Sequence, residues 1–340
     1  MKERDRLLQD WRDRALRLET QVKKAIIGQD RAVRLACIAA FARGHVLLEG
    51  DVGVGKTTLL RAIARCIGGA YERIEGTVDL MPSDLAYYTY VTEDGKPRVD
   101  HGPLLKHGDA LSIFFFNEIN RARPQVHALM LRVMAERSIS AFNREFHFPH
   151  LQVFADRNRV EKDETFEVPP AARDRFLLEI TVEVPEDRRL LESLMVNPRF
   201  HDVDALVETV EPDVLPYRQL TEIAQLIQDE IQTTETLRHY ALDVCAATRT
   251  PERYGINIDG AEAGHLIQAG ASPRGMSMLL RAARVAAWLT GRSSVEPEDV
   301  RDVYSEAVAH RVFFTPVYEL RRSEVAPELI QQILDRVAAP

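Results

Sequence analysis

Glycines and a lysine recur at a fixed spacing in the segment GDVGVGKT, residues 50–57. It matches the pattern G-x-x-x-x-G-K-[ST], in which the glycines let the backbone curl so that successive N–H groups point inward at phosphate oxygens. In that chemistry Lys56 contacts the β- and γ-phosphates, and the hydroxyl of Thr57 binds Mg²⁺. We therefore predict a site for ATP and Mg²⁺. Its predicted nucleotide-binding residues in this segment are Gly50, Asp51, Val52, Gly53, Val54, Gly55, Lys56, Thr57 and Thr58.

A second strand of this site is expected at IFFFNE, residues 113–118, an apolar run that ends in polar residues. In most ATP hydrolases of this kind the strand ends in Asp-Glu, and the two carboxylates orient a metal-bound water and polarise the attacking water. Here the pair is Asn117 and Glu118. We predict that Glu118 is the general base and that Asn117 contacts Mg²⁺ through a water, without supplying negative charge.

The amide at Asn117 has a kinetic consequence. We expect slow ATPase activity with a raised Mg²⁺ requirement, because an amide keeps the hydrogen bond to the metal-bound water but lacks the charge. Asn117→Asp should then lower the Mg²⁺ requirement and raise turnover. If that variant were no faster, the amide would be compensated elsewhere, for example by Asp156, or a later step would limit turnover.

The phosphate-binding segment lies between an expected strand, HVLLE at 45–49, and an expected helix at 57–69. Apolar residues recur in that helix at i, i+3, i+4 and i+7, and Gly68-Gly69 follow as a stop. Alternation of apolar runs with helical patterns predicts βαβ units and a parallel sheet, and so an α/β domain. The other expected strands are 71–75, 112–118, 151–156 and 176–184.

Beyond about residue 186 the runs that are typical of strands give way to helical periodicity, punctuated by prolines at helix starts and in loops. The sequence therefore predicts an α/β P-loop parallel-sheet domain followed by an all-helical domain. We place the boundaries at 1–24 for an N-terminal helix, 25–186 for the α/β domain and 187–340 for the helical domain. The N-terminal helix is expected to pack on the α/β domain rather than meet a partner.

Composition narrows the class of protein. The chain has 340 residues and a net charge of −8, and an acidic chain is a poor candidate for binding nucleic acid. Its three cysteines have no metal or redox spacing, so we expect buried thiols. The N-terminus is charged throughout, and no run of about 18 apolar residues occurs, so we expect a cytoplasmic protein without a membrane span.

Two further patterns have plain structural interpretations. EFHFPH at 145–150 alternates polar and aromatic residues, which favours a β-hairpin strand over a metal site formed by Glu145, His147 and His150. Four arginines near the expected general base could contact a phosphate, a neighbouring subunit or nothing, and we interpret them as a solvated or interface face. They are Arg121, Arg123, Arg132 and Arg137.

Taken in order, these motifs resemble those of the AAA+ ATPases and, within them, the MoxR family of the helix-2 insert clade. The resemblance covers roughly residues 20–335. It rests on IIGQ (26–29), GHVLLEGDVGVGKT (44–57), DLMPSDL (79–85), NEINRARPQVHALMLRVMAER (117–137), ARDRFLLEITVEVP (172–185) and GASPRGMSMLLRAAR (270–284). It implies that the helical domain is a lid and that the hairpin near 145 is the one that precedes the sensor 1 strand.

The resemblance also implies roles for single residues. Ile27 would lie beside the adenine, and Asn158 would be sensor 1, which helps to place the attacking water. Arg175 would be the arginine finger that reaches the neighbouring subunit, with Arg173 as the alternative, and Arg274 would be sensor 2 on the lid. A finger that acts in a neighbouring subunit requires a homo-oligomer, expected to be a hexameric ring. The expected partners are a von Willebrand factor A domain protein and a client protein.

Three functions remain open at this point. The first is a chaperone that hydrolyses ATP to remodel or mature a client, for example by metal or cofactor insertion, with methanol dehydrogenase as one candidate client. The second is a DNA-dependent motor, against which the acidic charge argues and which salt-dependent DNA binding would test. The third is a nucleotide-binding scaffold with little turnover, because of Asn117.

Overall fold

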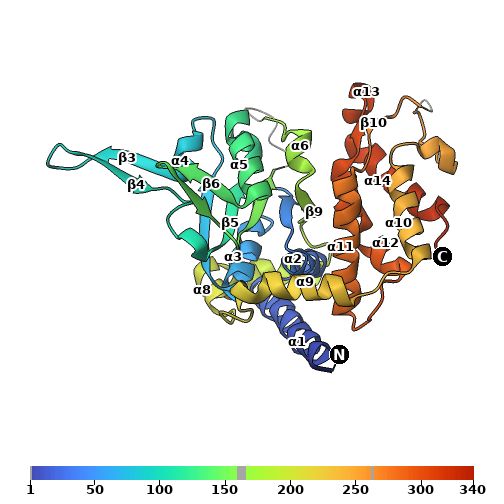
Figure 1. Ribbon diagram of the computed structural model, residues 1–340, viewed down its shortest axis with the longest axis horizontal. Helices are drawn as coiled ribbons and strands as arrows, with labels where there is room; N and C mark the ends of the chain where they lie inside the picture. The colour runs from blue at the N-terminus through green and yellow to red at the C-terminus, as the bar shows by residue number, and fades with distance from the viewer. Residues whose placement is uncertain (1, 159–165, 262–263) are drawn as a thin grey trace. The chain divides into compact units, whose positions relative to one another are not determined.

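The computed structural model describes residues 2–158, 166–261 and 264–340 (Figure 1). These residues form two compact units. The sheet unit contains Asp13–Arg175 and Ile180–Thr221, and the helical unit contains the residues up to Arg12, Phe176–Glu179 and Glu222–Pro340. The sheet unit therefore extends beyond residue 186, and the two units differ in their bounds from the domains predicted from the sequence.

The centre of the sheet unit is a five-stranded sheet with the order β2-β5-β8-β1-β9. The pairs β2–β5, β5–β8 and β8–β1 are parallel, as the βαβ pattern predicts. β5 is buried along its whole length, because helices cover both faces of such a sheet. The strands are β1 (His45–Glu49), β2 (Ala70–Glu75), β5 (Leu111–Asn117), β8 (Gln152–Arg157) and β9 (Phe176–Thr181).

The helix after the phosphate-binding segment is α3 (Lys56–Ile67), close to the predicted 57–69. It buries one apolar face and ends at Gly68, which has a φ of 73°. Other helices of this unit are α2 (Asp30–Phe41), α4 (Pro82–Ala86), α5 (Pro124–Glu136), α6 (Pro170–Arg173), α7 (Arg188–Val196) and α8 (Val203–Glu208). Short 3₁₀ turns lie at Gly108–Ala110, Ile119–Arg121, Pro198–Phe200 and Tyr217–Gln219.

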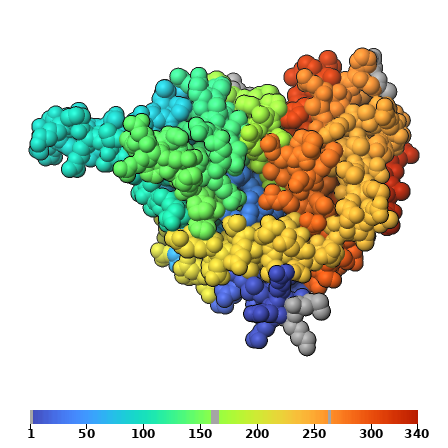
Figure 2. Space-filling model, viewed as in Figure 1, coloured from blue at the N-terminus to red at the C-terminus, as the bar shows by residue number. Residues whose placement is uncertain are grey.

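Two hairpins belong to the sheet unit. β6 (Ser138–Ala141) pairs with β7 (Arg144–His147), which confirms the strand predicted at 145. β3 (Tyr87–Val91) pairs with β4 (Pro97–His101) and projects from the sheet unit, as Figures 1 and 2 show. The two hairpins touch through their aromatic rings, since Tyr87 and Phe142 have centroids 5.3 Å apart.

The N-terminal helix α1 (Lys2–Ala25) begins in the helical unit and continues in the sheet unit. In the sheet unit it packs against α2, where the Cys37 thiol donates a weak hydrogen bond to the carbonyl of Ala15 at 3.8 Å. In the helical unit the indole N–H of Trp288 donates to the carbonyl of Leu8 at 3.2 Å. The prediction that this helix packs on the α/β domain is confirmed.

The helical unit packs amphipathic helices around a buried apolar core. It also contains one short antiparallel pair, β10 (Ile267–Ala269) with β11 (Phe313–Phe314), which helical periodicity does not predict. Several helices begin at a proline, which suits the first helical turn because its N–H is not needed there. The helices are α9 (Leu220–Glu230, starting in the sheet unit), α10 (Glu235–Ala247), α11 (Pro273–Leu289), α12 (Pro297–Val308), α13 (Pro316–Glu319) and α14 (Arg322–Arg336), with 3₁₀ turns at Pro251–Tyr254 and Ala309–Arg311.

Two further expectations from the sequence concern the cysteines and membrane-spanning helices. Cys37, Cys66 and Cys245 are all buried free thiols, as predicted. Within the described part of the chain, every helix is too short or too polar to cross a membrane.

Candidate active site

The loop between β1 and α3 has the geometry of an anion cradle. Gly53 and Gly55 have φ values of 82° and 95°, in the region that favours glycine. Gly50 is needed for another reason, because a Cβ there would lie 2.2 Å from the carbonyl oxygen of Val182. The loop delivers the chain to the N-terminus of α3, where free backbone N–H groups and the helix dipole favour an anion.

Lys56 lies at the start of α3, and its ammonium group faces back toward this loop. Its Nζ donates to the carbonyls of Gly50 at 2.7 Å and Asp51 at 3.1 Å, and to the side-chain oxygen of Asn158 at 2.7 Å. The carboxylate of Asp156 lies 3.6 Å away, and only 7% of the lysine side chain is exposed. A buried cation held mainly by neutral oxygens is well prepared to bind phosphate.

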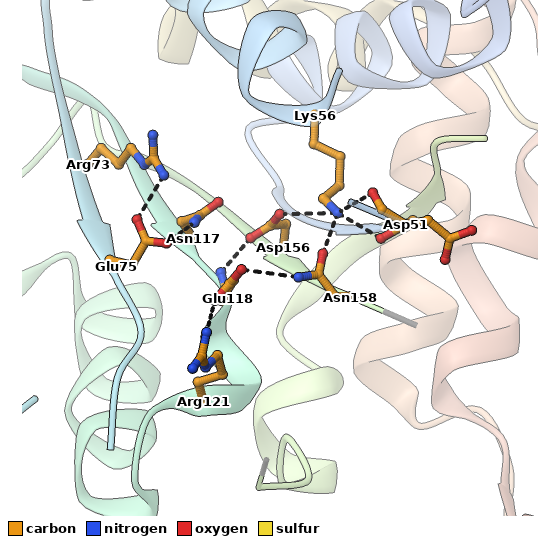
Figure 3. Close-up of polar contacts among 10 residues, drawn as sticks. Asp51, Lys56, Arg73, Glu75, Asn117, Glu118, Arg121, Asp156 and Asn158 are labelled. Carbon is orange, nitrogen blue, oxygen red and sulfur yellow. Dashed lines mark hydrogen bonds and ion pairs between the residues drawn. The ribbon is translucent and has the colours of Figure 1, made fainter. Parts of the chain in front are cut away.

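Glu118 follows β5 and occupies a tight turn with a φ of 52°. Its Oε1 accepts a hydrogen bond from the amide of Asn158 at 3.1 Å, and its Oε2 accepts one from Arg121 at 2.9 Å (Figure 3). Asn158 therefore bridges Lys56 and Glu118, through its two side-chain atoms. The structure brings together three residues that the sequence predicts for one site: Glu118 directly after β5, Asn158 directly after β8 and Lys56 at the start of α3.

Arg121 and Arg132 are two of the four arginines that we interpret from the sequence as a solvated or interface face. Arg121 pairs with the carboxylate of the predicted general base, a contact that the sequence does not predict. Its side chain is 39% exposed, so this ion pair is partly screened by water. Arg132 pairs with Glu136 on the exposed side of α5.

Asn117 is directed away from Lys56. Its amide donates to Oε1 of Glu75 on the neighbouring strand β2 at 2.8 Å, and Arg73 donates to the other oxygen of Glu75 at 2.8 Å (Figure 3). The predicted contact of Asn117 with a metal-bound water stays a prediction, and it would require the amide to keep an oxygen available.

Asp156 is the residue of this site to which the sequence analysis gave no firm role. It is 2% exposed, on β8, and accepts the backbone N–H of Glu118 at 2.5 Å. Burial raises the pKa of its carboxyl, while the Glu118 N–H and Lys56 act in the opposite direction. An acid near the end of an otherwise apolar buried run was visible in LQVFAD.

The predicted adenine segment, IIGQ, lies beside the phosphate-binding loop. A Cβ added to Gly55 would lie 3.1 Å from Cδ1 of Ile26, and a Cβ on Gly28 would collide with Pro185. The side chain of Gln29 donates to the carbonyl of Glu183, which ties the segment to the chain after β9. Ile27 is half-buried within it. Its contact with adenine remains a prediction.

The predicted arginines occupy different settings. Arg175 is half-buried just before β9, and its Nη1 donates to the carbonyl of Ala171 at 2.7 Å. Arg173 is buried at the end of α6. Arg274 is exposed in the first turn of α11, after Ser272 caps that helix, and belongs to the helical unit. Their roles as finger and sensor 2 stay predictions.

The residues fit a nucleoside triphosphate with Mg²⁺. The loop is open at Gly53, where an added Cβ would meet nothing within 4 Å, so a ligand has room to approach the backbone there. The hydroxyls of Thr57 and Thr58 lie in the first turn of α3, where an oxygen ligand for Mg²⁺ is expected. When bound, Mg²⁺ would neutralise phosphate charge, and Glu118 could act as a base on water.

A parallel sheet with this order, a glycine-rich loop that leads into α3, and an acid after β5 define a P-loop ATPase of the AAA+ class. Comparisons with known proteins agree. The family described as "ATPase family associated with various cellular activities (AAA)" matches residues 45–178, and the AAA lid domain matches residues 261–333.

Full-length relatives narrow the family. The chain is 59% identical to "Protein MoxR" of Methylorubrum extorquens, covering 99% of this chain and 98% of that protein. It is 53% identical to "Protein MoxR" of Paracoccus denitrificans, covering 99% of each. It is 33% identical to "Chaperone MoxR1" of Mycobacterium tuberculosis, covering 94% of this chain and 81% of that protein. A crystal structure of a candidate ATPase from Cytophaga hutchinsonii is similar with a TM-score of 0.83 and 26% identity, covering 100% of this chain and 98% of that one. The chain belongs to the MoxR family of AAA+ ATPases.

Proposed function

We propose that this protein binds ATP with Mg²⁺ and hydrolyses it to drive the remodelling or maturation of a client protein. The hydrogen-bonded line from Lys56 through Asn158 to Glu118 supports hydrolysis most directly. In this proposal Lys56 is the cation for the phosphates and Glu118 is the base, and both are hydrogen-bonded to the one amide side chain of Asn158. An attacking water between Glu118 and the γ-phosphate would be oriented by Asn158.

Activation of Glu118 is part of this proposal. In the structure its two carboxylate oxygens accept from Asn158 and Arg121. Each carboxylate oxygen can accept more than one hydrogen bond, so Glu118 can keep these contacts and still accept from an attacking water. Movement of Asn158 toward the γ-phosphate would expose Oε1 further, which would couple nucleotide binding to exposure of the base.

We further propose that the protein works as a homo-oligomeric ring, expected to be hexameric, in the cytoplasm. AAA+ family membership supports a ring. Arg175 is our candidate for the finger that completes a neighbouring subunit's site. It is more accessible than Arg173, which is buried within its own subunit. The proposed partners are a von Willebrand factor A domain protein and a client that receives a metal or cofactor, with methanol dehydrogenase as a candidate.

A scaffold with little turnover is the second candidate, and one observation favours it. The amide N–H of Asn117 donates to Glu75, and this side chain supplies no negative charge to a metal. Steady-state ATPase activity separates the two functions. If Glu118→Gln abolishes turnover while ATP still binds, the result supports a chaperone that hydrolyses ATP. A wild-type protein that binds ATP but releases no phosphate above the Glu118→Gln level supports the scaffold.

The partner can be tested with the same variant. Glu118→Gln should hold ATP without hydrolysing it, and so retain the complex that forms in the ATP state. Purification of tagged Glu118→Gln from the native host, with Lys56→Ala as the matched control, should enrich a partner in the first sample only. Equal recovery in both samples would contradict a nucleotide-dependent partner.

A further inference from the structure

The order of the strands gives β8 a special place. It lies between β1, which leads into the phosphate-binding loop, and β5, which leads to Glu118. In the register Phe116 pairs with Ala155, and Leu48 pairs with Asp156. A side chain at Asp156 is therefore one strand nearer to the phosphate-binding loop than a side chain at Asn117.

The side chains of Asn117 and Asp156 point in different directions from their strands. Asn117 is directed to Glu75 on β2, at the edge of the sheet, whereas Asp156 is directed to Lys56 and to the turn at Glu118 (Figure 3). The carboxylate that faces the phosphate-binding lysine thus comes from β8. The last residue of β5, Asn117, has an uncharged amide, and its N–H donates to Glu75.

The burial of Asp156 indicates that this carboxylate has a role in the site. A carboxylate taken out of water is unfavourable unless it is paired and hydrogen-bonded. Asp156 has two partners, the ammonium of Lys56 at 3.6 Å and the backbone N–H of Glu118 at 2.5 Å. Both partners belong to the proposed catalytic machinery, and buried acids with such partners cluster at functional sites.

We propose that Asp156 supplies from β8 the negative charge that Asn117 cannot supply from β5, and holds a water of the Mg²⁺ shell when ATP is bound. Mg²⁺ prefers hard oxygen ligands and keeps several waters, so an acid one strand away can serve as this outer contact. The inference rests on the proposed binding of ATP with Mg²⁺. It assigns Asp156 a second task, since its other oxygen positions the backbone of Glu118.

The test compares the affinity for a fluorescent, non-hydrolysable ATP analogue in saturating Mg²⁺ and in EDTA. The variants are Asp156→Asn, Asn117→Asp and the exchange Asn117→Asp/Asp156→Asn. Asp156→Asn keeps an oxygen that can accept from Glu118, so it removes the charge while the turn can be preserved. Asp100→Asn, which removes an exposed acid on β4, is the control for net charge.

The quantity compared is the affinity for the analogue in Mg²⁺ divided by the affinity for the analogue in EDTA. We expect Asp156→Asn to lower this ratio by about 10–100-fold, the range for loss of an outer-shell contact. Its affinity in EDTA should be equal to or above that of the wild type, since a negative charge near the phosphates is gone. The exchange variant should recover at least a third of the wild-type ratio, and Asp100→Asn should keep it. Asn117→Asp alone should raise the ratio less than threefold.

Three results would overturn the proposal. The first is an unchanged ratio in Asp156→Asn. The second is an equal fall of both affinities in that variant, which would show a merely structural role. The third is an exchange variant no better than Asp156→Asn. If Asp156→Asn does not fold, Asp156→Ser replaces it, because a hydroxyl oxygen can still accept from the N–H of Glu118 but carries no charge. A wild-type ratio in that variant would count against the proposal, and a lowered ratio with an undiminished affinity in EDTA would support it. A wild-type protein that binds no analogue in either condition would instead refute the proposed function.

Discussion

Asn117 and Glu75 face each other across two parallel strands, and the amide of Asn117 donates to Oε1 of Glu75 at 2.8 Å. The pair explains why an amide suits the end of β5. A carboxylate there would lie against the carboxylate of Glu75, which already pairs with Arg73. The same contact directs Asn117 away from the phosphate-binding loop, and the carboxylate that lies near Lys56 is that of Asp156.

Asn117→Asp should therefore lower stability. We expect a loss of about 1 kcal/mol in the free energy of unfolding, because a hydrogen bond is replaced by like-charge repulsion that water screens at the exposed Glu75. Thermal unfolding at low ionic strength checks this, and Glu75→Gln in the same chain should restore most of the loss. Asn117→Asp with unchanged stability would mean that the two side chains separate easily.

Turnover of Asn117→Asp distinguishes two expectations. The sequence alone leads us to expect a faster enzyme with a lower Mg²⁺ requirement. The proposal for Asp156 leads us to expect turnover within about twofold of the wild type, since the charge is already present, and a twofold change is only about 0.4 kcal/mol of barrier. Steady-state phosphate release over a range of Mg²⁺ concentrations decides between them.

Lys56→Ala should remove most of the affinity for ATP. Hydrogen bonds to charged groups contribute about 1.5–3 kcal/mol each, so one lost contact corresponds to roughly 10–100-fold in affinity. Calorimetry with ATP and Mg²⁺ measures it, and Lys106→Ala, which changes an exposed lysine paired with Glu72, is the matched control. An affinity within a factor of two of the wild type would show that the site is elsewhere.

Arg175→Ala should bind ATP normally and lose hydrolysis, by about 10³–10⁵-fold if the residue acts as an arginine finger. Mixing Arg175→Ala subunits with Glu118→Gln subunits should restore some activity, because some interfaces then combine an intact base with an intact finger. Absence of recovery, with subunit exchange verified, would contradict a shared site. Arg173→Ala should instead lower thermal stability, because Arg173 is buried.

His127 should make stability depend on pH. Burial lowers the pKa of this side chain from its ordinary 6.5, while the hydrogen bond from its Nε2 to the carbonyl of Ile119 at 2.7 Å opposes the shift. The unfolded chain then binds a proton more readily, so the free energy of unfolding falls as pH drops below about 6.5 through the lowered pKa. Above that pH the group has no effect.

The measurement compares melting temperatures at pH 8 and pH 5.5. The difference between the two should shrink in His127→Gln, which can still donate to Ile119 but does not titrate. His147→Gln, a change at an exposed histidine on β7, should keep the wild-type difference. Equal pH dependence in wild type and His127→Gln would show that other groups cause it.

Much of this protein can be predicted from local sequence. The phosphate-binding loop is contiguous, and its chemistry depends on glycines and a lysine at fixed spacing, so the positions of Gly50–Lys56 and the start of α3 follow from the chain alone. The strands β1, β5 and β8 follow from apolar runs of the length that a buried strand needs. Family resemblance adds Asn158, whose side chain contacts Lys56 and Glu118, and its role as sensor 1 stays a prediction.

Contacts between residues that are distant in the chain were decided only by the tertiary structure. Asn117 turns to Glu75 because β2 lies beside β5, and Asp156 reaches Lys56 because β8 lies between β5 and β1. Arg121 meets Glu118 because the chain turns sharply at a positive φ. The sequence shows which polar residues lie at the end of each strand. The direction in which each side chain points, and so which acid faces the phosphate-binding lysine, depends on strand order and register, which no local pattern encodes.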